Sequence, residues 1–435
     1  MTTSAAPTRP AVRLGAPVGA VRLGAPVGTL TPEQVRGFVH EQLAATDVDG
    51  RSVLVLVPDD TRTCPLPLLW SAVHEALAGR ASRITVLVAL GTHKGMTEQA
   101  LATMLGYPAG EFETTFPGAT LHNHEWWDDS TFANLGTIPA ARIEEISEGR
   151  LSRDVDVLLN KLVLDHDLAL VVGPVLPHEV VGMSGGNKYF FPGIAGHDVI
   201  DVSHWIGALI TSWQIIGTTG ITPVRALINE GCSYIPAEKL AFCVVVEAGS
   251  DLLHSISFGD TQSSWADAAQ VCAATHVEYL DAPVQRVLSV IPPLYKDIWT
   301  AAKGFYKLEP VVADGGEVII YAPWITEIAQ MHPEIYELGY HCRDYFVKQW
   351  DRFKDYPWGV LAHSTHLRGA GTYDPETGVE ELRVTVTLAT AIPDEVCRAA
   401  NLGYLDPASV DVEALSADPD TFVVPNAGEV LFRLR

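Results

Sequence analysis

Short apolar runs separated by amphipathic stretches dominate the first part of the chain. Four of these runs are hydrophobic at nearly every position and rich in β-branched or aliphatic residues: 53–57, 84–90, 168–172 and 242–246. Strands buried on both faces have this continuous pattern, whereas strands with one solvated face alternate apolar and polar residues. The pattern predicts an α/β fold whose first domain is a parallel sheet covered by helices on both sides.

A helix is expected to begin at Thr31. This threonine suits the N-cap, Pro32 suits the first turn, and Gln34 completes a capping box three residues after the cap. The apolar residues that follow recur at helical spacing and would share one inward face: Val35, Phe38, Val39 and Leu43.

The second part of the chain has further strand-like runs, at 317–322 and 384–389. Because 435 residues are too many for one small core, two domains are expected. We divide the chain into an N-terminal arm, an N-terminal α/β domain that binds a cofactor, a smaller C-terminal α/β domain, and a tail that packs back on the first domain: residues 1–28, 29–275, 276–400 and 401–435.

The arm contains a duplication. Residues 11–19, Ala-Val-Arg-Leu-Gly-Ala-Pro-Val-Gly, recur unchanged at 20–28. Two copies are too few for a solenoid, so we interpret them as a local duplication in a terminal strand or arm with no role in catalysis.

Composition excludes several function classes. The net charge of -24 argues against a nucleic-acid partner, and it means that any anionic substrate must be bound by individual cations. The six cysteines are scattered without a CxxC pair, which favours a reducing cytoplasm over secretion. No apolar run reaches about 18 residues, so no membrane-spanning helix is expected.

Polar motifs follow three of the predicted strands. Residues 58–62 (Pro-Asp-Asp-Thr-Arg) follow the first run, 91–94 (Gly-Thr-His-Lys) follow the second, and His178 comes shortly after the third. In such sheets, ligands bind beyond the carboxyl ends of the strands. Since imidazole titrates near neutral pH, His93 and His178 are candidates for general acid and base, although a lone histidine is more often structural.

Arg62 has two interpretations. Its guanidinium can clamp a carboxylate or phosphate through two hydrogen bonds, or it can fix a turn by pairing with Asp59 or Asp60. Magnesium binding by the two aspartates is disfavoured because nothing nearby resembles a phosphate loop.

Lys188 follows a glycine-rich bend in the stretch 176–188. Gly185 and Gly186 let the backbone approach a bulky ligand closely, and His178 and His204 lie ten residues before and sixteen after the lysine. These residue types leave several chemistries open. Lys188 suits a Schiff base with pyridoxal phosphate or a substrate carbonyl, an ordinary loop lysine is the alternative, and zinc held by His178, His204 and a carboxylate has suitable ligands.

In order and spacing, these motifs resemble the lactate racemase family that uses the nickel-pincer nucleotide. The resemblance covers most of residues 50–210, and a weaker resemblance continues at Lys303 and Gly304. It rests on Asp59-Asp60-Thr61-Arg62, Gly91-Thr92-His93, His178, Ser184-Gly185-Gly186-Asn187-Lys188 with Pro192-Gly193, and His204.

The resemblance implies a two-domain enzyme with its active site in the cleft between the domains. The cofactor, a pyridinium-3-thioamide-5-thiocarboxylate mononucleotide carrying nickel, would be joined to Lys188 through a thioamide. His204 would be the protein ligand to nickel, which suffices when the pincer supplies three donors. Further residues would line the cofactor site: Asp59, Arg62, Gly185 and Gly186.

The resemblance also implies how a 2-hydroxy acid reacts. His93 and His178 would lie on opposite sides of the substrate. One would remove the hydroxyl proton while the C2 hydride passes to the cofactor, and return of the hydride to the other face of the 2-keto acid would invert the centre. Arg62 and Lys303 would hold the substrate carboxylate or the cofactor phosphate, and Asp59 would orient its neighbours.

One departure from the family concerns the substrate. The family's lactate enzymes have glutamine where this chain has Thr300, three residues before Lys303. The shorter side chain leaves more room for a larger, polyhydroxylated substrate; a structural role for the 363–368 segment is the alternative. The residues expected to contact such a substrate are His363, His366, Arg368 and Trp358.

We therefore expect an isomerase: a racemase or epimerase of 2-hydroxy acids, with an aldonate-type sugar acid favoured over lactate or another short aliphatic or aryl hydroxy acid. The alternative from another class is a non-catalytic cofactor carrier, which would need Lys188 and His204 but neither His93 nor His178. Loading would depend on the proteins that synthesise the cofactor, and the expected location is the cytoplasm.

Overall fold

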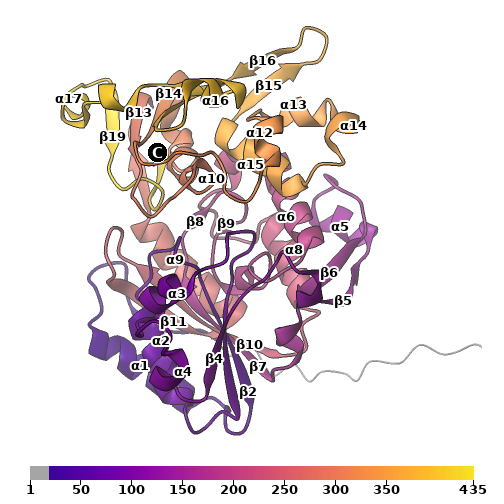
Figure 1. Ribbon diagram of the computed structural model, residues 1–435, viewed down its shortest axis with the longest axis vertical. Coiled ribbons are helices and arrows are strands. Elements are labelled where there is room, and N and C mark those ends of the chain that lie inside the picture. Colours follow the sequence, from indigo (N-terminus) through magenta and orange to yellow (C-terminus); the bar gives the residue numbers. More distant parts are fainter. Residues whose placement is uncertain (1–18) are drawn as a thin grey trace, which may run out of the picture.

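Two sheets, each with its own hydrophobic core, organise the protein (Figure 1). The computed structural model describes residues 19–435 and confirms the α/β class. The larger sheet is built from the first part of the chain, and a five-stranded sheet is built from the last part.

The larger sheet has seven strands in the order β1-β11-β10-β7-β2-β3-β4. Its five strands from β10 to β4 are parallel, but β11 and β1 extend the sheet in antiparallel pairing. The prediction of a parallel sheet missed these two, because only residues 247–252 join β10 to β11, which is too short for a parallel crossover. The strands are β1 (Val21–Gly24), β2 (Ser52–Val57), β3 (Arg83–Val88), β4 (Ala119–Asn123), β7 (Leu168–Pro174), β10 (Glu238–Val246) and β11 (Leu253–Asp260).

The four apolar runs form β2, β3, β7 and β10, and helices cover both faces of these strands as predicted. In β2, for example, Val53 and Val55 pack into one core cluster, and Leu54 and Leu56 pack into the other. The first face is covered by α1 (Pro32–Ala44), α2 (Leu66–Leu77), α3 (Glu98–Leu105) and α4 (Phe112–Thr115). The second is covered by α5 (Ala140–Ile146), α6 (His197–Ile210), α7 (Ser212–Ile215), α8 (Pro223–Cys232) and α9 (Thr261–Thr275).

Helix α1 begins as its sequence predicts. Thr31 is the N-cap, and the reciprocal hydrogen bonds of a capping box join it to Gln34. The apolar residues at helical spacing are buried: Val35, Phe38, Val39 and Leu43.

The second copy of the duplicated segment lies at the edge of the larger sheet. Its residues Val21–Gly24 form β1, which pairs with β11. Residues 11–18 of the first copy lie outside the described residues.

The five-stranded sheet is parallel throughout, in the order β18-β17-β14-β13-β19. The predicted runs at 317–322 and 384–389 lie in β14 and β17. Its strands are β13 (Val284–Val290), β14 (Val312–Ala322), β17 (Val384–Thr390), β18 (Gly403–Tyr404) and β19 (Thr421–Val424). Its helices are α10 (Ile298–Ala301), α11 (Lys303–Tyr306), α12 (Glu334–Leu338), α13 (Arg343–Val347), α14 (Trp350–Phe353), α15 (Trp358–Arg368), α16 (Asp394–Ala399) and α17 (Val412–Ser416).

Four two-stranded sheets complete the architecture. They are β5 (Phe132–Ile138) with β6 (Val155–Asn160), β8 (Pro177–His178) with β9 (Gly182–Met183), β12 (Val277–Leu280) with β20 (Leu431–Leu434), and β15 (Gly371–Asp374) with β16 (Val379–Leu382).

The segment after residue 400 contacts both parts of the molecule. It supplies β18 and β19 to the smaller sheet and β20 to a pair with β12. Glu429 accepts hydrogen bonds from the Thr63 hydroxyl and, at 3.0 Å, from the Gly249 amide, both in the first part of the chain. Lys307 donates to the carbonyls of residues 428 and 429, at 2.5 and 2.9 Å. These contacts join the strand ends of the larger sheet to the smaller one.

Across residues 19–435, the structure contains no helix that is both long enough and apolar enough to cross a membrane.

Gly173 in β7 leads to our first prediction, because a Cβ there would lie 1.8 Å from the Tyr189 hydroxyl oxygen. G173A should displace this buried ring and lower the free energy of unfolding by about 1–3 kcal/mol. The matched control is G37A in α1, where a Cβ meets nothing within 4 Å, and where alanine should be neutral or stabilising. Urea denaturation measures both, and equal stability of the two variants would contradict the packing described here.

Candidate active site

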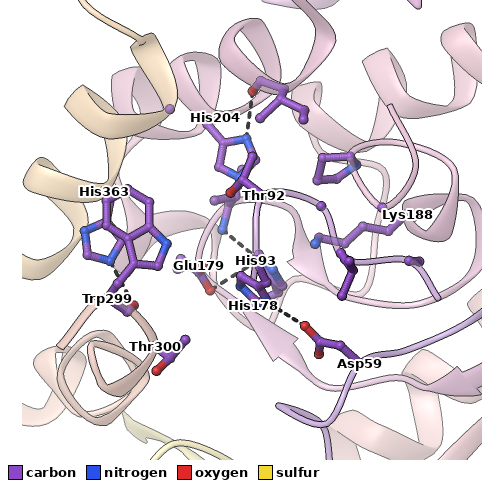
Figure 2. Close-up of a pocket in the computed structure, with 18 of the residues that line it drawn as sticks. Asp59, Thr92, His93, His178, Glu179, Lys188, His204, Trp299, Thr300 and His363 are labelled. Carbon is purple, nitrogen blue, oxygen red and sulfur yellow. Dashed lines mark hydrogen bonds and ion pairs between the residues drawn. The ribbon is translucent and has the colours of Figure 1, made fainter. Parts of the chain in front are cut away.

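A cavity of about 270 Å³ lies at the carboxyl ends of β2, β3 and β7 and extends to residues of α10, α11 and α15. Most of the residues singled out from the sequence line it together. They are Asp59, Arg62, His93, His178, Gly185, Lys188, His204, Thr300, Lys303, His363 and His366. Strand ends, the glycine-rich bend and three later helices therefore deliver their polar groups to one space (Figure 2).

Three of the predicted site residues do not line this cavity. Gly186 packs against α9, where a Cβ would lie 2.6 Å from the Thr261 carbonyl oxygen, so this glycine is required for packing. The Trp358 indole donates to the Lys354 carbonyl and packs on Trp350, which turns it away from the cavity. Arg368, at the C-terminal end of α15, also lies outside the cavity lining.

His93 forms a pair with Asp59. Its Nδ1 lies 2.5 Å from Oδ2 of Asp59, and the other carboxylate oxygen accepts a hydrogen bond from the Thr61 hydroxyl at 2.7 Å. Burial alone would raise the pKa of Asp59, but the charges of His93 and Arg62 outweigh it and lower the pKa. The ionised carboxylate accepts a hydrogen bond from Nδ1, so in the neutral ring of His93 the lone pair is on Nε2.

His178 has the opposite arrangement. The backbone amide of Val180 donates to Nδ1 of His178 at 3.1 Å, so in the neutral ring the proton is on Nε2. Burial, followed by the charges of Lys188 and Arg62, lowers the pKa of His178 well below its ordinary value. Glu179 Oε2 also lies 3.3 Å from Nδ1 and can accept a proton placed there. In their neutral forms, the two histidines thus offer one acceptor and one donor.

Lys188 and His204 both face the cavity (Figure 2). Within residues 19–435 the Lys188 amine makes no hydrogen bond or ion pair, and burial, with Arg62 and Arg225 adding to its effect, lowers its pKa to about 7. His204 Nδ1 donates to the Ile200 carbonyl at 2.7 Å, which leaves the Nε2 lone pair for a ligand. Burial lowers the pKa of His204 to about 4, so the ring is neutral at physiological pH.

Arg62 and Lys303 are cations without a carboxylate partner. Among the described residues Arg62 forms no ion pair, and its only side-chain hydrogen bond is to the Thr61 carbonyl at 3.5 Å, so the turn-fixing interpretation is not what the structure has. The amine of Lys303 is buried without a hydrogen bond, 4.7 Å from the centre of the Tyr295 ring. Burial, followed by the charge of Arg62, lowers the pKa of Lys303 well below its ordinary value. Both lack an anionic partner, and an anion bound beside them would favour the protonated amine of Lys303.

A stack of four aromatic rings forms one wall of the cavity. His363 lies 3.7 Å from Trp299, Trp299 lies 3.9 Å from His332, and His332 lies 6.3 Å from Trp126, all between ring centres. His363 also hydrogen-bonds the Trp299 carbonyl through Nε2 at 3.0 Å. Sequence reasoning missed Trp126, Trp299 and His332. Trp299 alone had a nearby signal, since it precedes Thr300.

Thr300 lies between this cavity and a second one of about 240 Å³, which shares Asp59, His93 and Thr300 with the first. Its hydroxyl donates to Asp297 at 2.7 Å, and its amide donates to the same oxygen at 2.9 Å. These bonds hold the side chain at the N-terminus of α10, where Thr300 lines both cavities.

No group of three or more His, Cys, Asp or Glu side chains in the described part of the chain is arranged to hold a metal ion together. This argues against zinc held by His178, His204 and a carboxylate. A metal at His204 would need donors from another molecule.

The fold and this cavity define an α/β protein with a lysine, two differently oriented histidines and unpaired cations at the carboxyl edge of a parallel sheet. Residues 38–215 match the lactate racemase N-terminal domain. This match and the similarities below support a lactate racemase-like family.

Two lactate racemases are similar in sequence. Those of Thermoanaerobacterium thermosaccharolyticum and Lactiplantibacillus plantarum are 24% and 26% identical over 278 and 275 residues, which is 62% of this chain in each case. The matches span 60% of the length of each relative.

Two solved structures share the fold. A protein from Thermotoga maritima is 33% identical, with a TM-score of 0.87 over 95% of this chain and 100% of the other. The lactate racemase apoprotein of T. thermosaccharolyticum is 18% identical, with a TM-score of 0.69 over 93% of each chain.

Because the cavity histidines are buried, we expect the free energy of unfolding to fall in acid. Burial lowers the pKa of His332 to about 4 and the pKa of His363 and His366 to about 3. Between those values and about 6.5, the unfolded chain binds more protons than the folded one. Their stabilisation is therefore complete above about pH 6.5 and is lost as the pH falls towards 4.

We expect the free energy of unfolding, from urea titrations between pH 7 and 5, to fall with pH. H366Q should reduce the slope by up to about 1.4 kcal/mol per pH unit. Equal pH slopes of the free energy of unfolding for the wild type and H366Q would contradict the assignment of a buried, neutral His366.

Proposed function

We propose that this protein is a racemase or epimerase that inverts C2 of a 2-hydroxy acid. One observation carries the proposal: Lys188, His204, His93 and His178 face a single cavity that also contains the unpaired cations Arg62 and Lys303. The kinship with lactate racemases supports this class of reaction, since these proteins act on a 2-hydroxy acid.

The residues present fit a nickel-pincer nucleotide. Acylation of a lysine needs a neutral amine, and the pKa of Lys188, lowered by burial to about 7, leaves a large neutral fraction at physiological pH. His204 presents an imidazole lone pair, which is a suitable nickel donor, and the pincer would supply the remaining donors. When bound, the cofactor would supply the acceptor and donor of the C2 hydride.

The side chains of this protein divide the remaining work. Arg62 and Lys303 hold the substrate carboxylate, which restores the anionic partner that both cations lack. His93, oriented by Asp59, accepts the hydroxyl proton at Nε2 or returns it from there. The ring stack lines one side of the cavity and limits how the substrate can be oriented there.

His178 can take part in both directions of the reaction because two groups are available to its Nδ1. With the Val180 amide donating to Nδ1, the ring presents an Nε2 proton; with Nδ1 protonated towards Glu179, Nε2 can accept one. Each stereoisomer then meets a histidine in the protonation state that its hydroxyl requires.

A cofactor carrier without catalysis is the alternative class. It would need Lys188 and His204, but it would not need the hydrogen-bonded pair of His93 and Asp59, because a carrier transfers no substrate proton.

Co-expression with the cofactor-synthesis proteins tests this proposal. H93Q and H178Q should abolish racemisation, because each removes one proton acceptor, while the mass increment at Lys188 and the nickel content stay at the wild-type level. The matched control is H122Q, at an exposed histidine of β4 outside the cavity, which should retain activity. Chiral chromatography, intact mass and metal analysis give the three readouts. Full activity in both cavity variants would eliminate the mechanism, and unloaded wild-type protein would eliminate the attachment.

We further propose that the substrate is an aldonate-type sugar acid. A polyhydroxylated chain fixed at its carboxylate would extend past Thr300 into the second cavity, which is lined by polar side chains including Asp60, Lys94 and Lys296. Lactate would leave that space to water.

Chain length tests the choice of substrate. The wild type should convert gluconate with a higher kcat/KM than lactate, and T300Q should reduce the ratio of gluconate to lactate about tenfold by narrowing the passage. T300S keeps a small hydroxylated side chain and should preserve the ratio. A preference for lactate that T300Q does not change would favour the short-chain alternative.

A further inference from the structure

Arg225 is a buried cation that the mechanism above does not use. It is 1% exposed and lies in the first turn of α8, the end of a helix where positive charge is unfavourable. No carboxylate within residues 19–435 pairs with it, and burial lowers its pKa to about 9, which still leaves it charged at neutral pH. An arginine this costly to bury is expected to serve a purpose.

The guanidinium of Arg225 donates its hydrogen bonds to the loop that carries Lys188. One terminal nitrogen donates to the Gly185 carbonyl at 3.0 Å, and the other donates to the Met183 carbonyl. The guanidinium lies over the Trp265 ring of α9, 4.1 Å from its centre, and a Cβ on Gly186 would lie 2.7 Å from the Cβ of the same tryptophan. Arginine suits this place because its planar fork can bond two carbonyls and stack on an aromatic ring at once.

The same loop is fixed on its other side. The Asn187 side chain donates to Asn229 at 3.0 Å and accepts from the Thr261 hydroxyl at 2.5 Å. Both α8 and α9 therefore hold the residues that precede Lys188 by hydrogen bonds. The amine of Lys188 itself has no hydrogen-bond partner among the described residues.

We propose that Arg225 is a positioning residue for Lys188: its fork fixes the loop so that the amine enters the cavity, and its uncompensated charge lies behind the loop and disfavours a second charge on that amine. The charges around the amine are the cations Arg62 and Arg225, which disfavour its protonation, and Glu179 and Asp59, which oppose them. Burial is the largest cause of the lowered pKa of Lys188, and Arg225 adds to it from behind the loop, outside the cavity lining. This inference rests on the proposed function, because a neutral amine at Lys188 serves the attachment of the cofactor. The experiment below does not depend on that attachment.

Competitive acetylation of the cofactor-free protein tests it. A neutral lysine amine attacks acetic anhydride, forms an amide and releases acetic acid, so the rate at Lys188 follows its neutral fraction. Mass spectrometry of the Lys188 peptide, with free phenylalanine as internal standard, gives the rate from pH 5 to 10. The wild-type midpoint should lie near 7. A midpoint near the ordinary lysine value would overturn the proposal without any variant.

R225M removes the charge and should raise the midpoint by about one unit, which slows labelling at pH 7 about fivefold. R225K keeps the charge, and its midpoint should stay near that of the wild type, although it cannot bond both carbonyls in one plane. R352Q is the matched control, because Arg352 also covers an aromatic ring, Phe353, but at the surface. It should label as the wild type does.

An R225M midpoint equal to that of the wild type would refute the role of the charge. If R225M does not fold, R225K decides: a midpoint raised by a full unit despite the retained charge would show that packing alone sets the reactivity of the lysine. These measurements need no turnover. The lowered midpoint of Lys188 and its dependence on Arg225 can therefore be found in a protein that racemises no hydroxy acid, and they can be absent from an active racemase.

Discussion

The burial of positive charge is the constraint on which this site depends. Lys188, Arg62, Lys303 and Arg225 come together in a protein of net charge -24, and carboxylates do not neutralise them one by one. Backbone carbonyls and aromatic faces replace part of the lost hydration, as Trp265 and two carbonyls do for Arg225. The remaining cost appears as lowered lysine pKa values, so Lys188 offers a neutral amine, whereas Arg62 keeps its charge and can bind an anion.

Much of the fold could be predicted because the signals are local. Continuous apolar runs identified β2, β3, β7 and β10, and three residues identified the start of α1. The antiparallel strands β11 and β1 were missed because pairing direction depends on connection length and not on apolar content. Strands β18 and β19 are too short to have a periodic signal, and only their place beside β17 and β13 makes them strands.

The site could be predicted in part for a related reason. Asp59, His93 and His178 follow strands, so the topology of a parallel sheet brings them to one edge. The ring stack joins segments near residues 126, 299, 332 and 363, and no local pattern links them. Conversely, Gly186 and Trp358 lie within informative motifs but face other parts of the molecule, because packing decides which way each residue points.

The cavity is built from segments that are synthesised at very different times. His93 and Lys188 come from the first part of the chain, and Thr300, His363 and His366 come from the second part. A nascent chain can complete the larger sheet once residue 260 has emerged, but the cavity still lacks one wall at that point. Any enzyme that modifies Lys188 in its finished surroundings must therefore recognise a chain that has been made at least to residue 366 and has folded.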